Sequence, residues 1–485
     1  MNADELFALH VAAGFSQYRG NLQFVEQVLK AGEMPDAADP VVASYVEQLK
    51  RHLSRQCIRE NDGFLLRFAL VAPGAYRGIH PPLAVLSPER GGFSEKRLEE
   101  ASRQLGRLRE ALGLGYHCFP DLSRETATAL RELSTRASNP AVSDEKWVGW
   151  HGGLSPTEAE KLTDRAFRCL DSALENVREV GNSVLEALAA LRPDGLGGTT
   201  ARLLECEVFW PSSLYRGAPD AVAEMLIQQI DTADGILLNH LLLALAWTRG
   251  EVAHDAFLQW RTIPPPWTSE LHVPVEDYLH GAGWALEQDG SRRELISLSC
   301  HQIVKVPQLS EERLVVPCRV PAGAHCPACG SALSWLFDFA ALPPRFFAAD
   351  RAGAPRKLLC CLNCACFSPV FSWYSPDGTA RRHLDTVSSE TAPAPTPPSC
   401  WCQLSLAPFP PFAAAQPFEF RDASTLGGFP MWLQDFEYPR CPGCTRVMNF
   451  LAQFDNLAMP TPEEGLYYGF FCPPCQIAAV SYQQT

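Results

Sequence analysis

Paired cysteines in the last third of the chain constrain its fold more than any other feature. Of the 18 cysteines, thirteen lie between Cys318 and Cys475. Eight of these form four Cys-x-x-Cys pairs, which are Cys326/Cys329, Cys361/Cys364, Cys441/Cys444 and Cys472/Cys475. Two such pairs brought together supply four thiolates, the ligand set of a tetrahedral metal site. The sequence therefore predicts two four-cysteine sites.

The arrangement of the pairs is repeated. Cys326-Pro-Ala-Cys329 and Cys441-Pro-Gly-Cys444 are 115 residues apart. The apolar residues that follow keep the same offset, and they are Leu333, Leu336, Phe339 and Leu342 against Met448, Leu451, Phe454 and Leu457. The second pairs of each set follow at an offset of 111 residues. This register predicts an internal duplication into two related β-rich modules, residues 301–387 and 418–485.

We expect each module to hold one structural zinc ion. Four thiolates close the coordination shell, whereas a catalytic zinc keeps an open position. The spacings are Cys-x2-Cys-x31-Cys-x2-Cys and Cys-x2-Cys-x27-Cys-x2-Cys, both longer than usual. At the first site, Cys360, Cys366 and His325 are alternative ligands. Two other interpretations stay open: reduced thiols in an ordinary β core, and a redox dithiol at Cys472-Pro-Pro-Cys475.

Residues 1–300 have the pattern of a mainly helical, acidic domain. Ser155-Pro156-Thr157-Glu158 is a helix start with a capping serine, proline at the first position and glutamate at the third. Asp234 begins another helix, and Gly250 separates it from the next. Short helices with short connections predict a HEAT- or armadillo-like array or an irregular bundle. The Asp289-Gly290 turn predicts a hairpin within 283–298.

The expected fold is therefore α+β and multidomain. A segment with eight prolines, residues 388–417, separates the two β modules and is predicted to be an extended linker or a strap. Phe367–Tyr374 has the composition of a strand, with Pro369 at its start or at a sheet edge.

The charge and the absence of known catalytic motifs limit the classes of function that the sequence supports. The formal net charge is −14, of which residues 1–300 carry −12, with 29 basic against 41 acidic side chains. This balance argues against nucleic acid and anionic membranes as partners. The sequence contains no His-Glu-x-x-His, P-loop, Gly-x-Ser-x-Gly or Gly-x-Gly-x-x-Gly motif. Enzyme activity is thus unsupported, although nothing in the sequence excludes it.

The expected location is the cytoplasm. The N-terminal residues MNADELFALH are acidic where a signal peptide would be basic. The longest apolar run, Ile236–Trp247, has 12 residues and includes Asn239 and His240, so it is too short and too polar to cross a bilayer.

A glycine-rich segment, Leu426-Gly427-Gly428-Phe429-Pro430-Met431-Trp432-Leu433-Gln434, is the remaining candidate site. One interpretation is an edge that binds a partner, formed by Trp432, Gln434, Tyr467 and Tyr468. The other is a turn at the start of a strand, with the tryptophan filling the core.

These residues carry a resemblance to a known family. Gly-Gly-Phe-Pro-x-Trp-x-Gln, the following Cys-Pro-x-Cys, and Tyr467-Tyr468-x-Phe470-Phe471-Cys472-x-x-Cys475 resemble the YwqG-like family of bacterial proteins over about residues 301–485. They are more distantly similar to the C-terminal domain of the programmed-cell-death-protein-2 family. The resemblance implies a β-rich, internally duplicated fold. It also implies an escort of nascent ribosomal protein in the eukaryotic relatives and immunity against toxins in some bacterial ones.

The sequence favours a non-catalytic protein-interaction protein, of the immunity or escort kind, that binds a basic protein. The acidic helical region would attract a cationic partner by charge. The simpler alternative is that the charge only keeps a large protein soluble. The competing function is an enzyme with an unrecognised site where the helical and β regions meet.

Overall fold

The computed structural model describes residues 144–171, 175–305, 315–339, 357–375, 380–382, 400–404, 408–415, 424–455 and 465–484, together with residues 2, 3, 6, 7 and 10. The chain divides into two compact units, Met1–Leu188 and Ala189–Thr485. Most of the predicted helical region before residue 144 lies outside the described residues. In the part that is described, no helix is both long and apolar enough to traverse a lipid bilayer.

The first unit contains α8 (Asp144–Gly152), α9 (Pro156–Leu170) and most of α10 (Glu175–Leu191). The predicted start of α9 is confirmed, because Ser155 Oγ accepts a hydrogen bond from Glu158 N at 3.2 Å. One face of α9 is buried, including Leu162, Ala166 and Phe167. The helix is thus held by an amphipathic face and a capped end.

A chain of buried hydrogen bonds joins the N-terminal residues to α8. His151 Nδ1 lies 2.8 Å from Trp147 O, so this nitrogen donates and His151 Nε2 accepts. His10 Nε2 lies 2.9 Å from His151 Nε2 and donates to it, while His10 Nδ1 accepts from Ser183 Oγ at 3.1 Å. Burial lowers the pKa of His151 to about 4, so both rings are neutral near pH 7.

The second unit begins with short helices. They are η3 (Gly197–Thr200), α11 (Ala201–Glu205), η4 (Ser212–Tyr215), α12 (Asp220–Ile230), α13 (Gly235–Thr248), α14 (Glu251–Thr262), η5 (Pro266–Glu270) and η6 (Val275–Ala282). Asp234 and Gly250 are the N-cap residues of α13 and α14, which confirms the predicted starts. Whether these helices form a repeat or an irregular bundle stays a prediction.

The predicted hairpin follows as β1 (Trp284–Leu286) and β2 (Arg292–Glu294), which pair antiparallel around Asp289-Gly290. Trp284 is fully buried, and its indole N–H donates to Ala246 O at 3.0 Å. The hairpin is thereby tied to α13.

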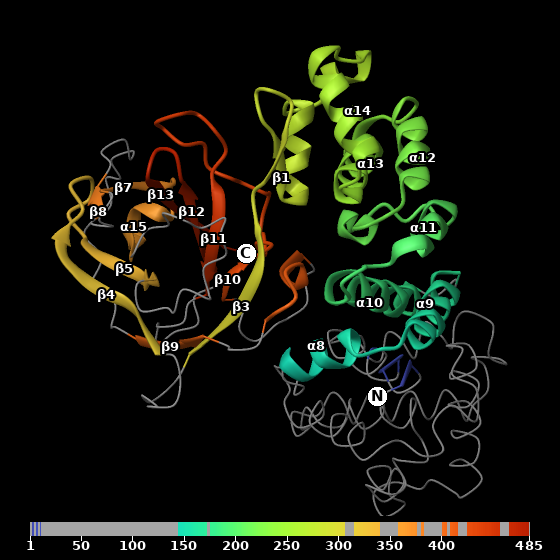
Figure 1. Ribbon diagram of the computed structural model, residues 1–485, viewed down its shortest axis with the longest axis horizontal. Coiled ribbons are helices and arrows are strands. Elements are labelled where there is room, and N and C mark those ends of the chain that lie inside the picture. Colours follow the sequence, from blue (N-terminus) through green and yellow to red (C-terminus); the bar gives the residue numbers. More distant parts are fainter. Residues whose placement is uncertain are drawn as a thin grey trace, which may run out of the picture. The chain divides into compact units, whose positions relative to one another are not determined.

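All other strands in the described part of the chain belong to one antiparallel sheet. They are β3 (Ser297–Lys305), β4 (Val315–His325), β5 (Ala332–Asp338), β6 (Lys357–Cys360), β7 (Val370–Tyr374), β8 (Ala380–Arg382), β9 (Cys400–Leu404), β10 (Thr425–Gly428), β11 (Asn449–Phe454), β12 (Leu466–Cys472) and β13 (Ile477–Gln483). Their order in the sheet is β6-β5-β4-β9-β3-β10-β11-β12-β13-β7-β8 (Figure 1). β7 begins directly after Pro369, as predicted.

The sheet curls so that distant strands share one core. Leu359 N of β6 donates to Tyr374 Oη of β7 at 3.1 Å, although these strands lie far apart in the sheet order. One buried cluster contains residues from both predicted modules, such as Phe337 and Phe454, whose rings are 5.4 Å apart. The predicted α+β class is therefore confirmed for the described residues.

The predicted domain boundaries stay predictions, but two observations bear on them. β9 lies within the proline-rich segment 388–417 and pairs with β4 and β3. Trp247 of α13 packs against Phe429 at 4.8 Å between ring centroids. Helices and sheet thus pack together within the second unit. The short helices α15 (Leu362–Ala365) and η10 (Ala413–Ala415) complete it.

Candidate metal centres

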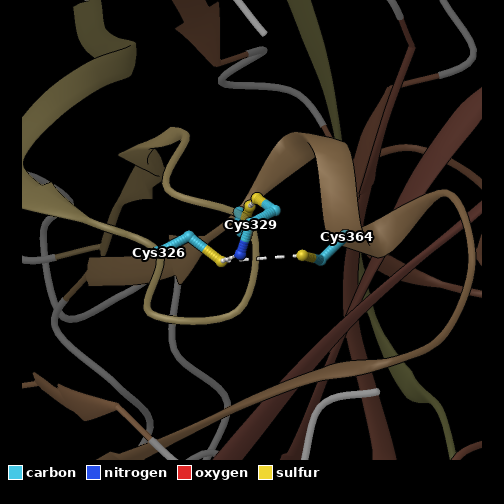
Figure 2. Close-up of side chains that lie close together, drawn as sticks. Cys326, Cys329 and Cys364 are labelled. Carbon is cyan, nitrogen blue, oxygen red and sulfur yellow. Dashed lines mark hydrogen bonds between the residues drawn. The ribbon is translucent and has the colours of Figure 1, made fainter. Parts of the chain in front are cut away.

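The first four-cysteine group joins two turns of the sheet. Cys326 and Cys329 follow β4, while Cys361 and Cys364 follow β6 at α15. Cys326 Sγ lies 3.6 Å from Cys364 Sγ, and Cys329 Sγ lies 3.5 Å from Cys361 Sγ. Figure 2 shows the Cys326 and Cys364 thiols pointing toward one another. All four residues are buried.

The second group is built in the same way. Cys441 and Cys444 form a turn before β11, Cys472 ends β12, and Cys475 lies in the turn to β13. Cys444 Sγ and Cys472 Sγ are 3.5 Å apart. Cys441 and Cys472 are buried, whereas Cys444 and Cys475 are partly exposed.

Both groups fit a tetrahedral metal ion. In each group the four sulfur atoms lie within 4.8 Å of one another. Sulfur ligands at about 2.3 Å from a tetrahedral metal ion lie about 3.8 Å from one another. The shortest sulfur–sulfur distances, 3.5 to 3.6 Å, are close to this value. The eight predicted cysteines can therefore hold two metal ions.

Backbone amides point at sulfur atoms in both groups. Cys329 N lies 3.4 Å from Cys326 Sγ, and Gly443 N lies 3.4 Å from Cys441 Sγ. Such amides stabilise thiolate charge. The turns are closed by hydrogen bonds from Gly330 N to Cys326 O and from Thr445 N to Cys441 O, both 2.8 Å.

The thiol pKa values differ within each group. Burial raises the pKa of Cys329, but hydrogen bonds with Ser331, Asn363 and Cys326 together outweigh this effect and lower the pKa to about 6. Burial raises the pKa of Cys361 and of Cys472 far above the usual thiol value. Without a cation these groups cannot all be thiolates, and a bound divalent ion would supply the missing charge.

The alternative ligands lie outside the first group. Cys360 is buried on β6, one residue before Cys361, and Cys366 Sγ donates to Leu362 O at 3.3 Å. His325 is exposed. A third set on α14, the exposed Glu251 and Asp255 with the partly buried His254, also meets the geometric requirement for a metal ion. However, both ring nitrogens of His254 already have partners, Gly290 O at 2.9 Å and Asp255 Oδ1 at 3.0 Å.

The structure places the predicted partner-binding residues mostly in the core. Tyr468 is fully buried, Tyr467 is 5% exposed, and Trp432 is half-buried and stacks on Tyr468 at 4.9 Å. Only Gln434 is exposed, and its Nε2 donates to Gln484 O at 2.9 Å. The packing agrees with the core interpretation of Trp432, and a role in partner binding stays a prediction.

Side chains that the sequence did not single out for this role hold the glycine-rich segment in place. Gln453 Oε1 accepts from Met431 N at 2.7 Å, and Gln483 Oε1 accepts from Leu433 N at 3.2 Å. Tyr468 Oη also accepts from Leu433 N, at 3.3 Å. The available signal was polar glutamine in strands that are otherwise apolar, where a buried amide requires partners.

Charged groups gather where η6 and the β1–β2 hairpin meet the second cysteine turn. Arg440 Nη2 lies 3.1 Å from Asp277 Oδ1, and Arg446 Nε lies 3.3 Å from Glu287 Oε2. Burial, together with Arg440 and Arg293, lowers the pKa of His280 to about 4. These acidic and basic groups neutralise one another, an arrangement that holds the two regions together.

Comparison with known proteins identifies one relative of this chain. The chain is 33% identical to a Salmonella typhimurium (strain LT2) protein, "Uncharacterized protein YpfL", over 349 residues, which cover 68% of this chain and 78% of the relative. No family model matches the chain, so the YwqG-like resemblance stays a prediction. No solved structure matches it either. At this identity and coverage, the chain belongs to the same family as YpfL.

Proposed function

We propose that each four-cysteine group holds one structural zinc ion. Four thiolates at tetrahedral spacing are the ligand set that soft divalent ions prefer, and zinc is the usual occupant. No further coordination position is left for a substrate, so the metal would stabilise the turns rather than act in chemistry. The cysteine turns lie at the ends of neighbouring strands, around β4, β5 and β6 at the first site and around β11, β12 and β13 at the second. Metal binding at each site would therefore couple these turns to the folding of their part of the sheet.

We also propose that the two modules arose by duplication. The turns correspond at an offset of 115 residues, because Cys326 N donates to Ser331 O at 2.7 Å and Cys441 N donates to Arg446 O at 2.8 Å. The close sulfur pair of the first site, Cys329 and Cys361, corresponds to Cys444 and Cys472 of the second. A left-handed residue closes each turn, Gly330 at φ 74° and Thr445 at φ 61°.

For the whole chain we propose the binding of a basic protein, without chemistry on it. The observation that carries this proposal is the one-sided charge of residues 203–248. Their six carboxylates are all exposed, while their one cation, Arg216, is buried. Arg216 donates to the carbonyl oxygens of Ala189 and Pro193 and is unavailable to the surface acids. Immunity proteins and escorts of nascent proteins are two classes with cationic partners.

The competing proposal is an enzyme at the junction of η6, the hairpin and the second cysteine turn. Several ionisable groups do meet there, including His280, Asp277 and Tyr438. Their neighbours support a structural role more strongly, because Asp277 and Glu287 pair with arginines. Burial also keeps Tyr438 protonated by raising its pKa.

Affinity capture from the native cell tests the binding proposal. The tagged full-length chain is expected to retain a stoichiometric basic protein that is released as the salt concentration rises. Replacing three of the exposed carboxylates, Glu224→Gln, Asp231→Asn and Glu207→Gln, should weaken retention. Absence of any stoichiometric protein, together with turnover of a small molecule that His280→Gln abolishes, would favour the enzyme instead.

A further inference from the structure

Three large apolar side chains are exposed close to the start of α13. Trp210 is 59% exposed, Ile236 is 75% exposed and Leu237 is 43% exposed. Trp210 stacks on the ring of His240 with centroids 5.3 Å apart and planes at 25°. A tryptophan held at the surface by stacking on a neighbour is ordered in advance of any contact, and tryptophan is enriched among residues that dominate binding energy.

Helix geometry places these residues on one surface. Ile236 precedes His240 by four residues, so the two side chains lie one above the other on the same face of α13. Helix side chains lean toward the N-terminus, which carries the His240 ring, and Trp210 stacked on it, toward Ile236. Trp210, Ile236, Leu237 and His240 therefore form one apolar patch, here called the α13 patch.

Three exposed carboxylates lie close in the sequence to the residues of the α13 patch. Asp231 and Asp234 lie in the turn that leads into α13, and Glu207 lies three residues before Trp210; all three are exposed. Asp231 occupies the C-cap of α12, where the helix dipole disfavours a negative charge. Asp231 thus holds a negative charge where the helix dipole is unfavourable, and Trp210 and Ile236 expose apolar surface to water. A ligand that is both cationic and apolar would offset both costs.

We propose that the α13 patch binds a cationic polypeptide segment that carries a large apolar side chain. This inference rests on the proposed function and assigns its binding surface. The apolar side chain would pack on Trp210 and Ile236, while lysine or arginine residues on either side would pair with the carboxylates. An arginine can also lie over the exposed indole face. The same carboxylates repel nucleic acid and anionic lipid headgroups.

A synthetic peptide tests the surface directly. The probe is a fluorescein-labelled 16-residue peptide of lysine and leucine in an amphipathic helical pattern, titrated with the full-length chain and followed by anisotropy. Trp210→Ala is expected to raise its Kd at least tenfold. The matched control is Trp373→Ala, which removes a tryptophan that is 47% exposed on β7 and should leave the Kd within twofold.

A second pair of variants tests the charge. Asp231→Asn with Glu207→Gln should raise the Kd and flatten its dependence on salt between 50 and 200 mM, in the manner of lost ion pairs. Glu251→Gln with Asp255→Asn removes two exposed carboxylates from α14 and should change neither. Circular dichroism of each variant establishes that the fold is retained.

The outcomes separate this inference from the proposed function. A tenfold effect of Trp210→Ala with no effect of Trp373→Ala supports the α13 patch. Equal Kd values for the wild type and Trp210→Ala, or no binding of the peptide to the wild type, overturns it. If Trp210→Ala still captures the cellular partner at wild-type yield, a basic protein is bound elsewhere, so the function stands and this surface does not.

Discussion

Gly428 gives the sharpest stability test of the glycine-rich segment. Its φ is +75°, and a Cβ built on it would lie 2.6 Å from Cys300 Sγ and 3.0 Å from Pro411 O. The left-handed backbone costs an L-residue about 1–2 kcal/mol, and overpacking of a tight site adds about 1–3 kcal/mol. Gly428→Ala should therefore lower the free energy of unfolding by about 2–5 kcal/mol.

Thermal unfolding of the full-length chain, followed by circular dichroism, measures this loss. For a unit of this size, at about 2 °C per kcal/mol, this loss corresponds to a Tm lower by about 4–10 °C. The control is Gly198→Ala, because Gly198 is exposed and a Cβ there meets nothing within 4 Å. This control should leave the Tm unchanged or slightly raised.

A double variant isolates the steric part. Cys300→Ala removes the nearest atom but neither the left-handed φ nor the Pro411 carbonyl. Gly428→Ala should therefore be about 1 kcal/mol less destabilising in the Cys300→Ala background. A Tm for Gly428→Ala within 1 °C of the wild type would refute the described packing of this segment.

Three further predictions follow from the described contacts. Thr445→Gly should raise the unfolding free energy by about 0.5–1 kcal/mol, because it relieves a β-branched residue at φ 61°; a lower urea midpoint would contradict this. Tyr468→Phe should cost about 1–3 kcal/mol in the same urea assay, since Leu433 N and Met431 O lose a buried partner; an unchanged midpoint would show that these bonds are not made. Acidification should destabilise the first unit by up to about 3 kcal/mol, because unfolded histidine binds a proton near pH 6.5 whereas His151 binds one only at about pH 4; the protection factors of the α9 amides, corrected for the intrinsic exchange rate at each pH, should fall as pH falls through this window, and an equal fall in His151→Gln would argue against this origin.

The cysteine groups were predictable because ligand chemistry restricts their spacing. Cysteines in Cys-x-x-Cys pairs can supply four ligands to one metal ion in only a few combinations, so the sequence predicts both sets of four. The structure brings the same eight residues together in two groups. The helix start at Ser155 was also predictable, since capping by a side chain is a local property.

The buried positions of Tyr467 and Tyr468 could not be read from the sequence. Adjacent strand residues normally alternate between the two faces of a sheet, but every residue of β12 is buried. One face of β12 lies against the core that the curled sheet encloses, and the other is covered by the glycine-rich segment. The position of β9 between β3 and β4 could not be predicted either. Strand order depends on long-range pairing, and the sequence around β9 has the composition of a proline-rich linker.

Metal analysis of protein purified without chelators tests the two-zinc proposal most directly. Plasma mass spectrometry should find two zinc ions per chain, and X-ray absorption should find four sulfur ligands at about 2.3 Å. Cys361→Ser and Cys472→Ser should each lose one zinc ion, and the double variant should lose both. Wild-type protein without zinc, or single variants that keep two zinc ions, would contradict the assignment.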